Sequence, residues 1–346
     1  MSNELMAYDF GTRYIKAASK EAEVRALHAR KAATEVDQAN DMFVEDPSIY
    51  EVNGELWQFG HRAEGGEQAK RGATKYTDPD YYRSYLGYTL FNLFPDTNSR
   101  SITLFAGHAP HDSAYTDDIE DAVVGHEIVV THAGTTRKYK CNKIAFWPEP
   151  IGALMNDILD HEGHFVADSK LKSGNTLIID VGSLTIDYAV AVNQKIQEGQ
   201  IGSYREVPLI DVEERIFFRV QKRWKKELET LGHHNIANEI RIAMRTGSLD
   251  AGGYGKLNIS DIVHEETQPI IAFIQNMYLR LGGTGRFHNV LLTGGGSGIL
   301  MDRIVAALDR PENNKPIAAG DIDFIQYANV FGAWKLANYY RLNGVL

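Results

Sequence analysis

The sequence predicts an α/β protein made of two copies of one α/β unit, with a ligand site between the copies. Three glycine turns carry this prediction: one follows Asp9, one follows Asp180, and one begins at Gly294. Each comes after a short apolar segment, which is typical of a buried strand that ends in a tight turn. The first two turns share the order strand, aspartate, glycine, strand, and therefore indicate an internal duplication.

The elements of the first half follow from the hydrophobic pattern and the turn residues. Strands are expected at 5–9 and 14–18, and a hairpin at 50–60 is expected to turn at Asn53-Gly54, a pair that favours two-residue turns. Aromatic residues at helical spacing predict a helix over 80–93. The remaining segments are a strand at 101–106, a short helix at 119–124, paired strands at 127–132 and 136–143, a separate strand at 144–147 and a helix at 151–159.

The second half is expected to begin after a polar linker at 161–173. Two strands about a turn are expected within 175–192, and Pro269 is expected to kink or split a helix over 261–281. The other expected elements are helices at 212–231 and 235–245, a glycine-rich loop at 247–256, a strand at 290–292 that runs into the third glycine turn, a helix at 299–308, and helical segments at 322–328 and 330–340.

Composition places the chain among globular proteins of the cytoplasm. Its 346 residues suffice for two domains, and its 43% hydrophobic and 24% charged residues are ordinary values. No apolar run has the length of a membrane helix and the first residues lack the pattern of a secretory signal, so we expect no membrane association. Cys141 is the only cysteine, which excludes an intrachain disulfide and suits a reducing compartment.

Charge argues against direct nucleic-acid binding. The formal net charge is −10, whereas a domain that binds bare DNA usually carries a basic stripe. The densest basic run lies at 219–226 and includes Lys222, Arg223, Lys225 and Lys226. Because two glutamates follow it on an expected helix, this run is typical of a solvated helix face.

The segment 175–192 has the chemistry to bind a metal nucleotide. Asp180 ends an apolar strand, Gly182 and Ser183 make the turn, and Asp187 lies on the return strand. Backbone N–H groups of a glycine turn can face a phosphate because no Cβ blocks the approach. Carboxylates can hold Mg²⁺ through its water shell, since Mg²⁺ gives up water reluctantly. An ordinary structural hairpin explains the same residues, so this segment alone leaves both interpretations open.

Two further positions carry suitable chemistry. Lys16 follows Asp9 and Gly11 on the return strand, where its ammonium can reach a phosphate oxygen; the alternative is a solvated strand residue. Glu149 lies between two prolines where a strand meets a helix. Its carboxylate can interact with the helix N-terminus or polarise an attacking water, and spacing alone leaves both roles open.

Together these motifs resemble the actin, Hsp70 and sugar-kinase ATPase superfamily. Residues 9–16 resemble its first phosphate loop, residues 180–187 its second, and residues 293–297 its adenosine motif. The chain is most similar to the ParM/StbA branch of prokaryotic actins, through its length, the Pro-Glu segment at 148–150 and the ending Ala-Asn-Val-x-Gly at 328–332. The resemblance implies a duplicated, ribonuclease H-like α/β fold with a nucleotide cleft between its domains.

The resemblance also implies a role for each matching residue. Asp9 and Asp180 would hold hydrated Mg²⁺; Glu149 and Asp180 are the expected catalytic residues, with Glu149 positioning the hydrolytic water. Leu184 departs from the family pattern, where a second glycine is common. Glu213 and Arg215 are further candidates for base or ribose contacts. The residues expected to bind ATP or GTP are Asp9, Gly11, Thr12, Lys16, Gly182, Ser183, Leu184, Thr185, Asp187, Glu214, Gly294, Gly295, Gly296 and Ser297.

The expected domains follow the duplication. Domain I spans 1–165, with a smaller subdomain around 30–100, and the C-terminal helix within 322–346 returns to it. Domain II spans 166–321.

The implied function is an actin-like ATPase that polymerises into filaments and hydrolyses nucleotide to control filament turnover. Its expected role is segregation of plasmid or other extrachromosomal DNA through a DNA-binding adaptor protein. The alternative is a small-molecule, sugar-type kinase on the same fold. Sugar kinases are usually longer and carry a dedicated base for the substrate hydroxyl, and Glu149 is the one clear candidate here.

Overall fold

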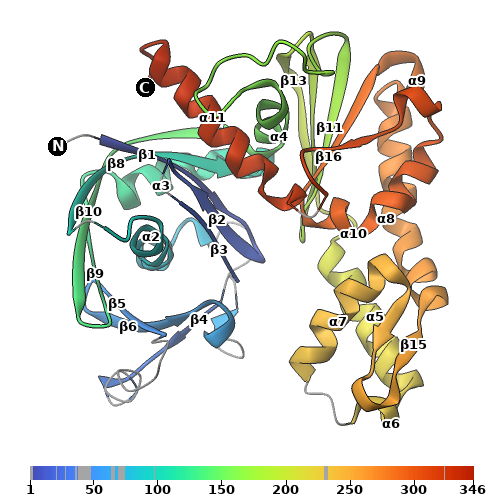
Figure 1. Ribbon diagram of the computed structural model, residues 1–346, viewed down its shortest axis with the longest axis horizontal. Coiled ribbons are helices and arrows are strands. Elements are labelled where there is room, and N and C mark those ends of the chain that lie inside the picture. Colours follow the sequence, from blue (N-terminus) through green and yellow to red (C-terminus); the bar gives the residue numbers. More distant parts are fainter. Residues whose placement is uncertain are drawn as a thin grey trace. The chain divides into compact units, whose positions relative to one another are not determined.

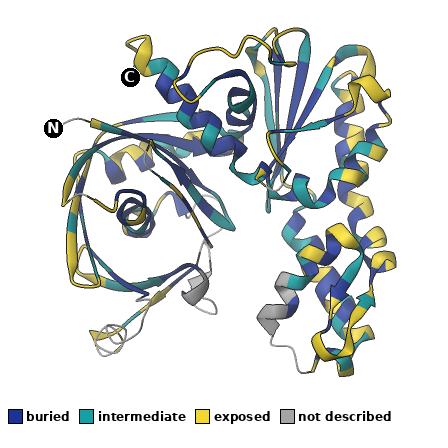
Figure 2. Cartoon of the chain, in the orientation of Figure 1, coloured by how far each residue is buried: buried dark blue, intermediate teal, exposed yellow. Residues whose placement is uncertain are grey.

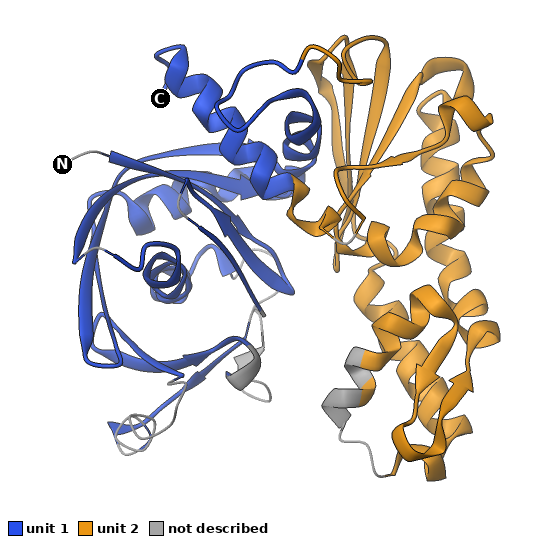
Figure 3. Ribbon diagram, viewed as in Figure 1, with its two compact units in different colours: residues 1–166, 329–346 blue, residues 167–328 orange. Residues whose placement is uncertain are grey.

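The computed structural model describes residues 3–20, 22–27, 29–35, 37, 48–63, 67–68, 75–96, 98–229, 233–322 and 324–346. The chain divides into two units (Figure 3): unit 1 is Met1–Val166 with Asn329–Leu346, and unit 2 is Ala167–Ala328. The sequence predicts a domain boundary between residues 165 and 166 and a last helix that returns to the first domain. The two units divide between residues 166 and 167, and residues 329–346 belong to unit 1. Parts of the expected subdomain around 30–100, namely 38–47 and 69–74, lie outside the described residues.

Unit 1 is built on one mixed sheet with the strand order β3-β2-β1-β8-β10-β9-β5-β6-β4-β7. β1, β8 and β10 run parallel, and the other neighbouring pairs are antiparallel. The strands are β1 (Asn3–Phe10), β2 (Tyr14–Ala18), β3 (Glu23–Leu27), β4 (Ala29–Ala32), β5 (Ile49–Val52), β6 (Glu55–Phe59), β7 (Glu67–Gln68), β8 (Ser99–His108), β9 (Glu127–His132) and β10 (Thr135–Pro148). The helices are η1 (Gly60–Ala63), α2 (Pro79–Leu93), η3 (Pro110–Tyr115), α3 (Thr116–Val123), α4 (Glu149–Ile158) and α11 (Ala328–Leu342).

The sheet of unit 1 curls around α2, which Figure 1 shows end-on inside the curve. The helix begins where the sequence predicts, because Asp78 caps it by accepting the N–H of Tyr81 and Pro79 occupies its first turn. Most of α2 is buried (Figure 2), and its tyrosines pack with Phe10 of β1 in an aromatic core. The ring centroids of Phe10 and Tyr82 lie 4.8 Å apart in an edge-on contact.

Unit 2 is built on a five-stranded sheet with the order β13-β12-β11-β16-β17, in which β11, β16 and β17 run parallel. Its strands are β11 (Asn175–Val181), β12 (Ile186–Val192), β13 (Lys195–Tyr204), β16 (Asn289–Thr293) and β17 (Ile317–Ala318), with β14 (Ser248–Asp250) and β15 (Lys256–Asn258) in a separate hairpin. Its helices are α5 (Leu209–Arg223), α6 (Lys225–Leu228), α7 (His233–Thr246), η4 (Gly252–Tyr254), α8 (Ser260–Arg280), α9 (Gly283–Arg286), α10 (Gly295–Leu308), η5 (Glu312–Asn314) and η6 (Ile325–Tyr327).

The expected duplication is visible in the strand orders. In unit 1 the order β3-β2-β1-β8-β10 begins with an antiparallel meander and continues with parallel strands. In unit 2 the order β13-β12-β11-β16-β17 repeats the same pattern. The strand that carries the aspartate, β1 or β11, therefore lies at the centre of each copy. Ligands of open α/β sheets bind beyond the carboxyl ends of such parallel strands.

Two expected boundaries in the strands are wrong. The strand at 136–143 and the strand at 144–147 form one element, β10, and a register shift between Cys141 and Lys143 accommodates the extra residue as a bulge. The glycine-rich segment 247–256 is not a simple loop, because Leu249 is buried and β14 pairs with β15 across a turn that contains Gly252 and Gly255.

Three expected helix boundaries also differ. The helix expected at 212–231 ends at Arg223 and a short second helix begins at Lys225; residues 230–231 lie outside the described residues. Pro269 does not split α8, because apolar residues on both sides of it pack into one core. Among its described residues, the segment expected to be helical at 322–328 contains the short 3₁₀ turn η6 and the first residue of α11. In the described part of the chain, no helix combines the length and apolar character that crossing a membrane requires.

The last helix, α11, packs closely on α4 within unit 1. Gly332 and Gly152 permit this contact, since a Cβ added to Gly332 would lie 1.6 Å from the carbonyl oxygen of Gly152. Polar bonds join the same helices: Asn329 Oδ1 accepts the N–H of Ala153 at 3.1 Å, and Lys335 Nζ donates to the carbonyl of Asn156 at 2.6 Å. Ala328-Asn329-Val330-x-Gly332 is therefore a packing motif between helices of unit 1.

Asp157 on α4 gives this interface a pH-dependent contribution to stability. Burial raises the pKa of Asp157 to about 6, and nearby Lys335 opposes the shift. Because this pKa is raised above the unfolded value, the stabilisation is present below about pH 4 and is lost as the pH rises through 6.

We expect Asp157→Asn to raise the free energy of unfolding by about 3 kcal/mol at pH 7.5 and by only about 1 kcal/mol at pH 4.5. Urea unfolding at the two pH values measures the difference. Asp160→Asn is the control, because backbone N–H groups lower the pKa of Asp160 and its contribution has the opposite pH dependence. Equal effects of Asp157→Asn at both pH values would contradict the assignment.

Candidate functional site

In unit 1 the first glycine turn joins β1 to β2 and pairs an acid with a base. Asp9 and Lys16 are register partners across the two strands, and the Lys16 ammonium contacts the Asp9 carboxylate. Asp9 is only 1% exposed, so it needs such a partner. Gly11 is required by space, because a Cβ there would lie 2.6 Å from the carbonyl oxygen of Tyr14. Lys16 is therefore held at the turn and does not extend into solvent as a simple strand lysine.

Sequence reasoning missed a second lysine at this turn. Lys75 is buried, and its ammonium donates to the carbonyl oxygen of Phe10 at 2.7 Å. The same ammonium lies 4.5 Å from the centroid of the Tyr76 ring. The bond to Phe10 fixes the backbone directly before Gly11 and Thr12. No sequence pattern could have found Lys75, since its partner is distant in the chain.

The carboxyl ends of three parallel strands bring Asp9 and Glu149 to one edge of the sheet. Asp9 of β1 is opposite Gly107 of β8, which is opposite Trp147 of β10, and Glu149 follows two residues later. A Cβ on Gly107 would lie 2.8 Å from the Trp147 ring and 3.4 Å from Glu149 Cγ. Glu149 is the first residue of α4, directly after the N-cap Pro148, so its carboxylate lies where the first turn of the helix favours a negative charge.

The pKa of Tyr76 reflects its burial and the negative charge of the acids at this edge. Burial raises the pKa of Tyr76 well above 10, and the carboxylates of Glu149, Asp112 and Asp9 act in the same direction. Three acids therefore lie within electrostatic reach of one hydroxyl, which stays neutral and able to donate a hydrogen bond. Asp112, also missed from the sequence, is buried and lies 3.0 Å from Nε2 of His111.

In unit 2 the second glycine turn joins β11 to β12. Asp180 and Asp187 are register partners on this antiparallel pair and are 4% and 1% exposed. The turn closes through the N–H of Gly182, which donates to the carbonyl of Thr185 at 2.9 Å, and the Thr185 hydroxyl donates to Asp187 Oδ2 at 2.7 Å. Ser183 and Leu184 are half-buried at the tip of the turn.

The third glycine turn packs directly on Asp180. Gly294 has φ 86°, and a Cβ there would lie 2.1 Å from Asp180 Oδ1. Gly296 is equally constrained, with Val181 Cγ1 at 2.6 Å from its added Cβ. Gly295 differs, because the nearest atoms to its added Cβ are side-chain ends at 3.9 Å. Ser297 is fully buried in the first turn of α10. The side of this turn that faces Gly295 thus has room for a ligand beside a helix N-terminus.

The three residues of α5 expected to contact the base or ribose, Glu213, Glu214 and Arg215, lie on different faces of the helix. Glu213 is buried and forms an ion pair with Arg241 of α7 at 2.9 Å. Arg241 Nη2 is one of the two side-chain atoms nearest the added Cβ of Gly295. Glu214 and Arg215 are exposed, and Arg215 pairs with Glu266 on α8 at 2.8 Å. The structure therefore brings Glu213 and Arg241 to the glycine turn, whereas Glu214 lies on another face of α5.

These residues fit a hydrated Mg²⁺ and a phosphate chain. Asp180 and Asp187 place two acids directly opposite each other on one sheet face, an arrangement that destabilises a sheet unless a cation or proton offsets it. Within the described ranges there is no group of three or more His, Cys, Asp or Glu side chains suited to a metal. A metal held through its waters, with few direct protein ligands, agrees with this donor set.

Comparison with known proteins identifies the fold. Residues 7–152 match the family model described as actin like proteins N terminal domain. A comparison with curated protein sequences finds no match. The solved structures that match include a ParM filament from Clostridium botulinum, with 15% identity, TM-score 0.72, and coverage of 97% of this chain and 99% of the other.

Two further matches are nucleotide complexes. Bacillus thuringiensis ParM with ATP has 13% identity and TM-score 0.70, with 99% of this chain and 100% of the other covered. The archaeal actin homolog Ta0583 in complex with ADP has 15% identity and TM-score 0.73, with 96% and 99% covered. At these identities the likeness establishes the fold, and it confirms the expected actin-like architecture. Residues 7–152 therefore match the actin-like N-terminal domain family, and the chain has an actin-like fold over its length.

Proposed function

We propose that this actin-like protein is a nucleoside triphosphatase that binds Mg-ATP or Mg-GTP and assembles into filaments. The observation that carries the proposal is the repeated pair of turns, in which a buried aspartate ends the central strand of each unit beside a glycine bend. Similar structures include a ParM filament and a ParM with ATP, which supports both parts of the proposal.

In this proposal the two units act on one nucleotide. Asp9 and Asp180 hold Mg²⁺ through its waters, and bound Mg²⁺ would offset the charge of the phosphate oxygens. Lys16 contributes its ammonium on the side of unit 1. Backbone N–H groups of the turns at 11–12 and 182–184 donate to phosphate, and Gly294–Ser297 packs against adenosine.

Glu149 is the proposed group that positions the attacking water and accepts its proton at the carboxylate. Its place at the carboxyl end of β10, on the same sheet edge as Asp9, supports this role. Tyr76 keeps its proton because its pKa is raised by burial and then by Glu149, so its hydroxyl serves as a donor next to the acids. Positioning and electrostatics then supply most of the rate enhancement.

Segregation of plasmid or other extrachromosomal DNA is the proposed cellular role. The net charge of −10 disfavours direct contact with DNA, so a DNA-binding adaptor protein would connect the filament to its cargo. Hydrolysis in this scheme limits the lifetime of a filament, which suits a slow ATPase.

Assembly tests the proposal directly. We expect right-angle light scattering of the purified protein to rise with Mg-ATP above a critical concentration, and electron microscopy of the same sample to show filaments. Binding and hydrolysis of Mg-ATP without assembly, over a wide range of protein and salt concentration, would favour a monomeric kinase or ATPase.

Gly295→Ala separates a ligand contact from a folding defect. The added methyl has room in the protein and replaces glycine by a better helix former, so we expect an unchanged or slightly raised melting temperature. If adenosine packs on Gly295, the methyl occupies its space and the affinity for Mg-ATP falls at least about tenfold. Titration calorimetry measures the affinity, with Gly285→Ala as the control because an added Cβ there is likewise unhindered, with no atom within 4 Å. Unchanged affinity would remove Gly295 from the nucleotide contacts.

Glu149→Ala tests the catalytic assignment. Removing a group that orients water and takes its proton should slow phosphate release about a hundredfold, with the affinity for Mg-ATP largely retained. Glu120→Ala, an exposed glutamate of the same unit, is the control and should hydrolyse normally. Normal hydrolysis in the Glu149 variant would leave this residue only its charge interaction with the first turn of α4.

A further inference from the structure

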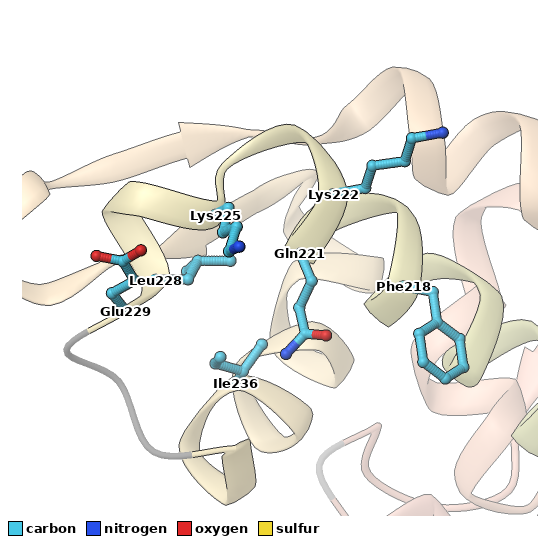
Figure 4. Close-up of a pocket in the computed structure, with 7 residues that line it drawn as sticks. All are labelled: Phe218, Gln221, Lys222, Lys225, Leu228, Glu229 and Ile236. Atoms are coloured by element: carbon cyan, nitrogen blue, oxygen red, sulfur yellow. The ribbon is translucent and has the colours of Figure 1, made fainter.

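Unit 2 carries a groove that the nucleotide site does not use. The α5–α7 groove has a volume of about 510 Å³ and is lined by residues of α5, α6 and α7 (Figure 4). Leu228 and Ile236 are buried in it, whereas Phe218 at one end is 64% exposed. Lys222 and Lys225 lie on its rim, and Figure 4 shows the Lys222 side chain directed outward from α5. Glu229 also lines the groove, so an apolar interior is combined with two lysines and one glutamate, which leave the lining with a net positive charge.

The two lysines of the groove, Lys222 of α5 and Lys225 of α6, differ from the arginines of α5. Arg215, Arg219 and Arg223 form ion pairs at 2.6–2.8 Å with three acids of α8, namely Glu265, Glu266 and Asp261. Neither Lys222 nor Lys225 forms an ion pair with any residue that the structure describes. One face of α5 is thus neutralised within the fold, and the groove face keeps its positive charge in a chain whose net charge is −10.

Unit 1 carries a surface with the complementary properties. The Phe165 loop, residues 159–166, follows α4 and displays Phe165 with 55% of its surface exposed. Glu162 precedes Phe165 in the same loop; its side chain is 83% exposed, and its carboxylate lies 3.7 Å from His164 Nδ1. The loop is tied down: Asp160 Oδ1 accepts the N–H groups of Glu162 and His164, each at 2.9 Å. An added Cβ on Gly163 would lie 2.4 Å from the backbone of α11. The ring centroids of Phe165 and Tyr339 lie 5.5 Å apart.

We propose that the Phe165 loop of one copy of this chain binds in the α5–α7 groove of the next copy. Phe165 would enter the apolar interior beside Phe218, and Glu162 would face Lys225. Both aromatic residues are exposed in the single chain, so neither surface is covered by its own molecule. The contact joins two different surfaces, and a heterologous contact of this kind repeats into an open head-to-tail polymer. The inference rests on the proposed filament function and gives that filament a specific longitudinal contact.

The fixed conformation of the Phe165 loop favours its binding in the α5–α7 groove. A loop that is already fixed by its own hydrogen bonds loses little conformational entropy on binding. A few aromatic side chains that become buried at the centre of an interface often contribute most of its binding energy. Because the charged pair lies at a solvent-exposed rim, higher salt should weaken the contact.

Phe165→Ser and the double variant Lys222→Glu with Lys225→Glu test the contact from its two sides. With Mg-ATP, each is expected to raise the critical concentration for light scattering at least about tenfold, with nucleotide affinity and melting temperature unchanged. Leu279→Ser, which alters an equally exposed apolar residue on α8, is the control and should assemble normally. Glu162→Lys should restore part of the assembly of the Lys225→Glu single variant.

Mixing the two assembly-deficient proteins distinguishes this contact from others. The Phe165→Ser protein retains the groove and the lysine variant retains the loop, so the mixture should form a complex of two chains by sedimentation velocity. Normal assembly of both variants would overturn the proposal and leave the groove to another partner. If the unaltered protein binds Mg-ATP and does not assemble, the filament function fails and this contact fails with it. If it assembles and the variants do as well, only the contact fails.

Discussion

The structure depends on holding carboxylates where water is nearly excluded. Asp9, Asp180 and Asp187 are each less than 5% exposed. Burial of a charge without compensation is costly, so each position must be supported by a cation, a hydrogen bond or a bound ligand. Lys16 supports Asp9, and the Thr185 hydroxyl supports Asp187. The glycine turns follow from the same constraint, because backbone at Gly294 can approach Asp180 only where no Cβ intervenes.

The duplication explains why the acids lie at strand ends and not elsewhere. In each unit the central strand has an antiparallel neighbour on one side and a parallel neighbour on the other. The antiparallel neighbour supplies the return strand with Lys16 or Asp187, and the parallel neighbour ends at the same edge. The third parallel strand is β10 in unit 1, which leads into Glu149, and the short strand β17 in unit 2. The two copies have therefore diverged in chemistry while keeping one topology.

Local sequence patterns made the hairpin and the glycine turns predictable. Asn53-Gly54 requires positive φ at both turn positions and has it, at 52° and 89°, so the hairpin was evident from two residues. The glycine turns were recognisable from their residues as well, although of Gly11, Gly182 and Gly294 only Gly294 has a positive φ. Lys75 and Arg241 were not recognisable, because their partners are remote in sequence and no period or spacing connects them. Glu213 and Glu214 are adjacent and differ only by helix phase, which packing against α7 decides.

The same limit applied to larger elements, where tertiary packing overrode local signals. Pro269 did not divide α8, because Val263 and Ile270 on its two sides are buried in one core. A glycine-rich segment became a hairpin because Leu249 is buried. In each case a side chain that prefers the interior outweighed a residue that favours a break.

Charge bears on both the proposed nucleotide site and the outer surface. Copies of a chain with a net charge of −10 repel one another, but at physiological salt this repulsion is screened beyond roughly 8 Å. Association then depends on local complementarity of charge and shape. The α5–α7 groove provides such a site, because its lysines carry positive charge on a chain whose net charge is −10. The groove shares no residue with the three glycine turns, so nucleotide would control assembly through the conformation of the units and not by occupying the contact. Separate surfaces of this kind allow hydrolysis to change the lifetime of a polymer without altering the residues that hold it together.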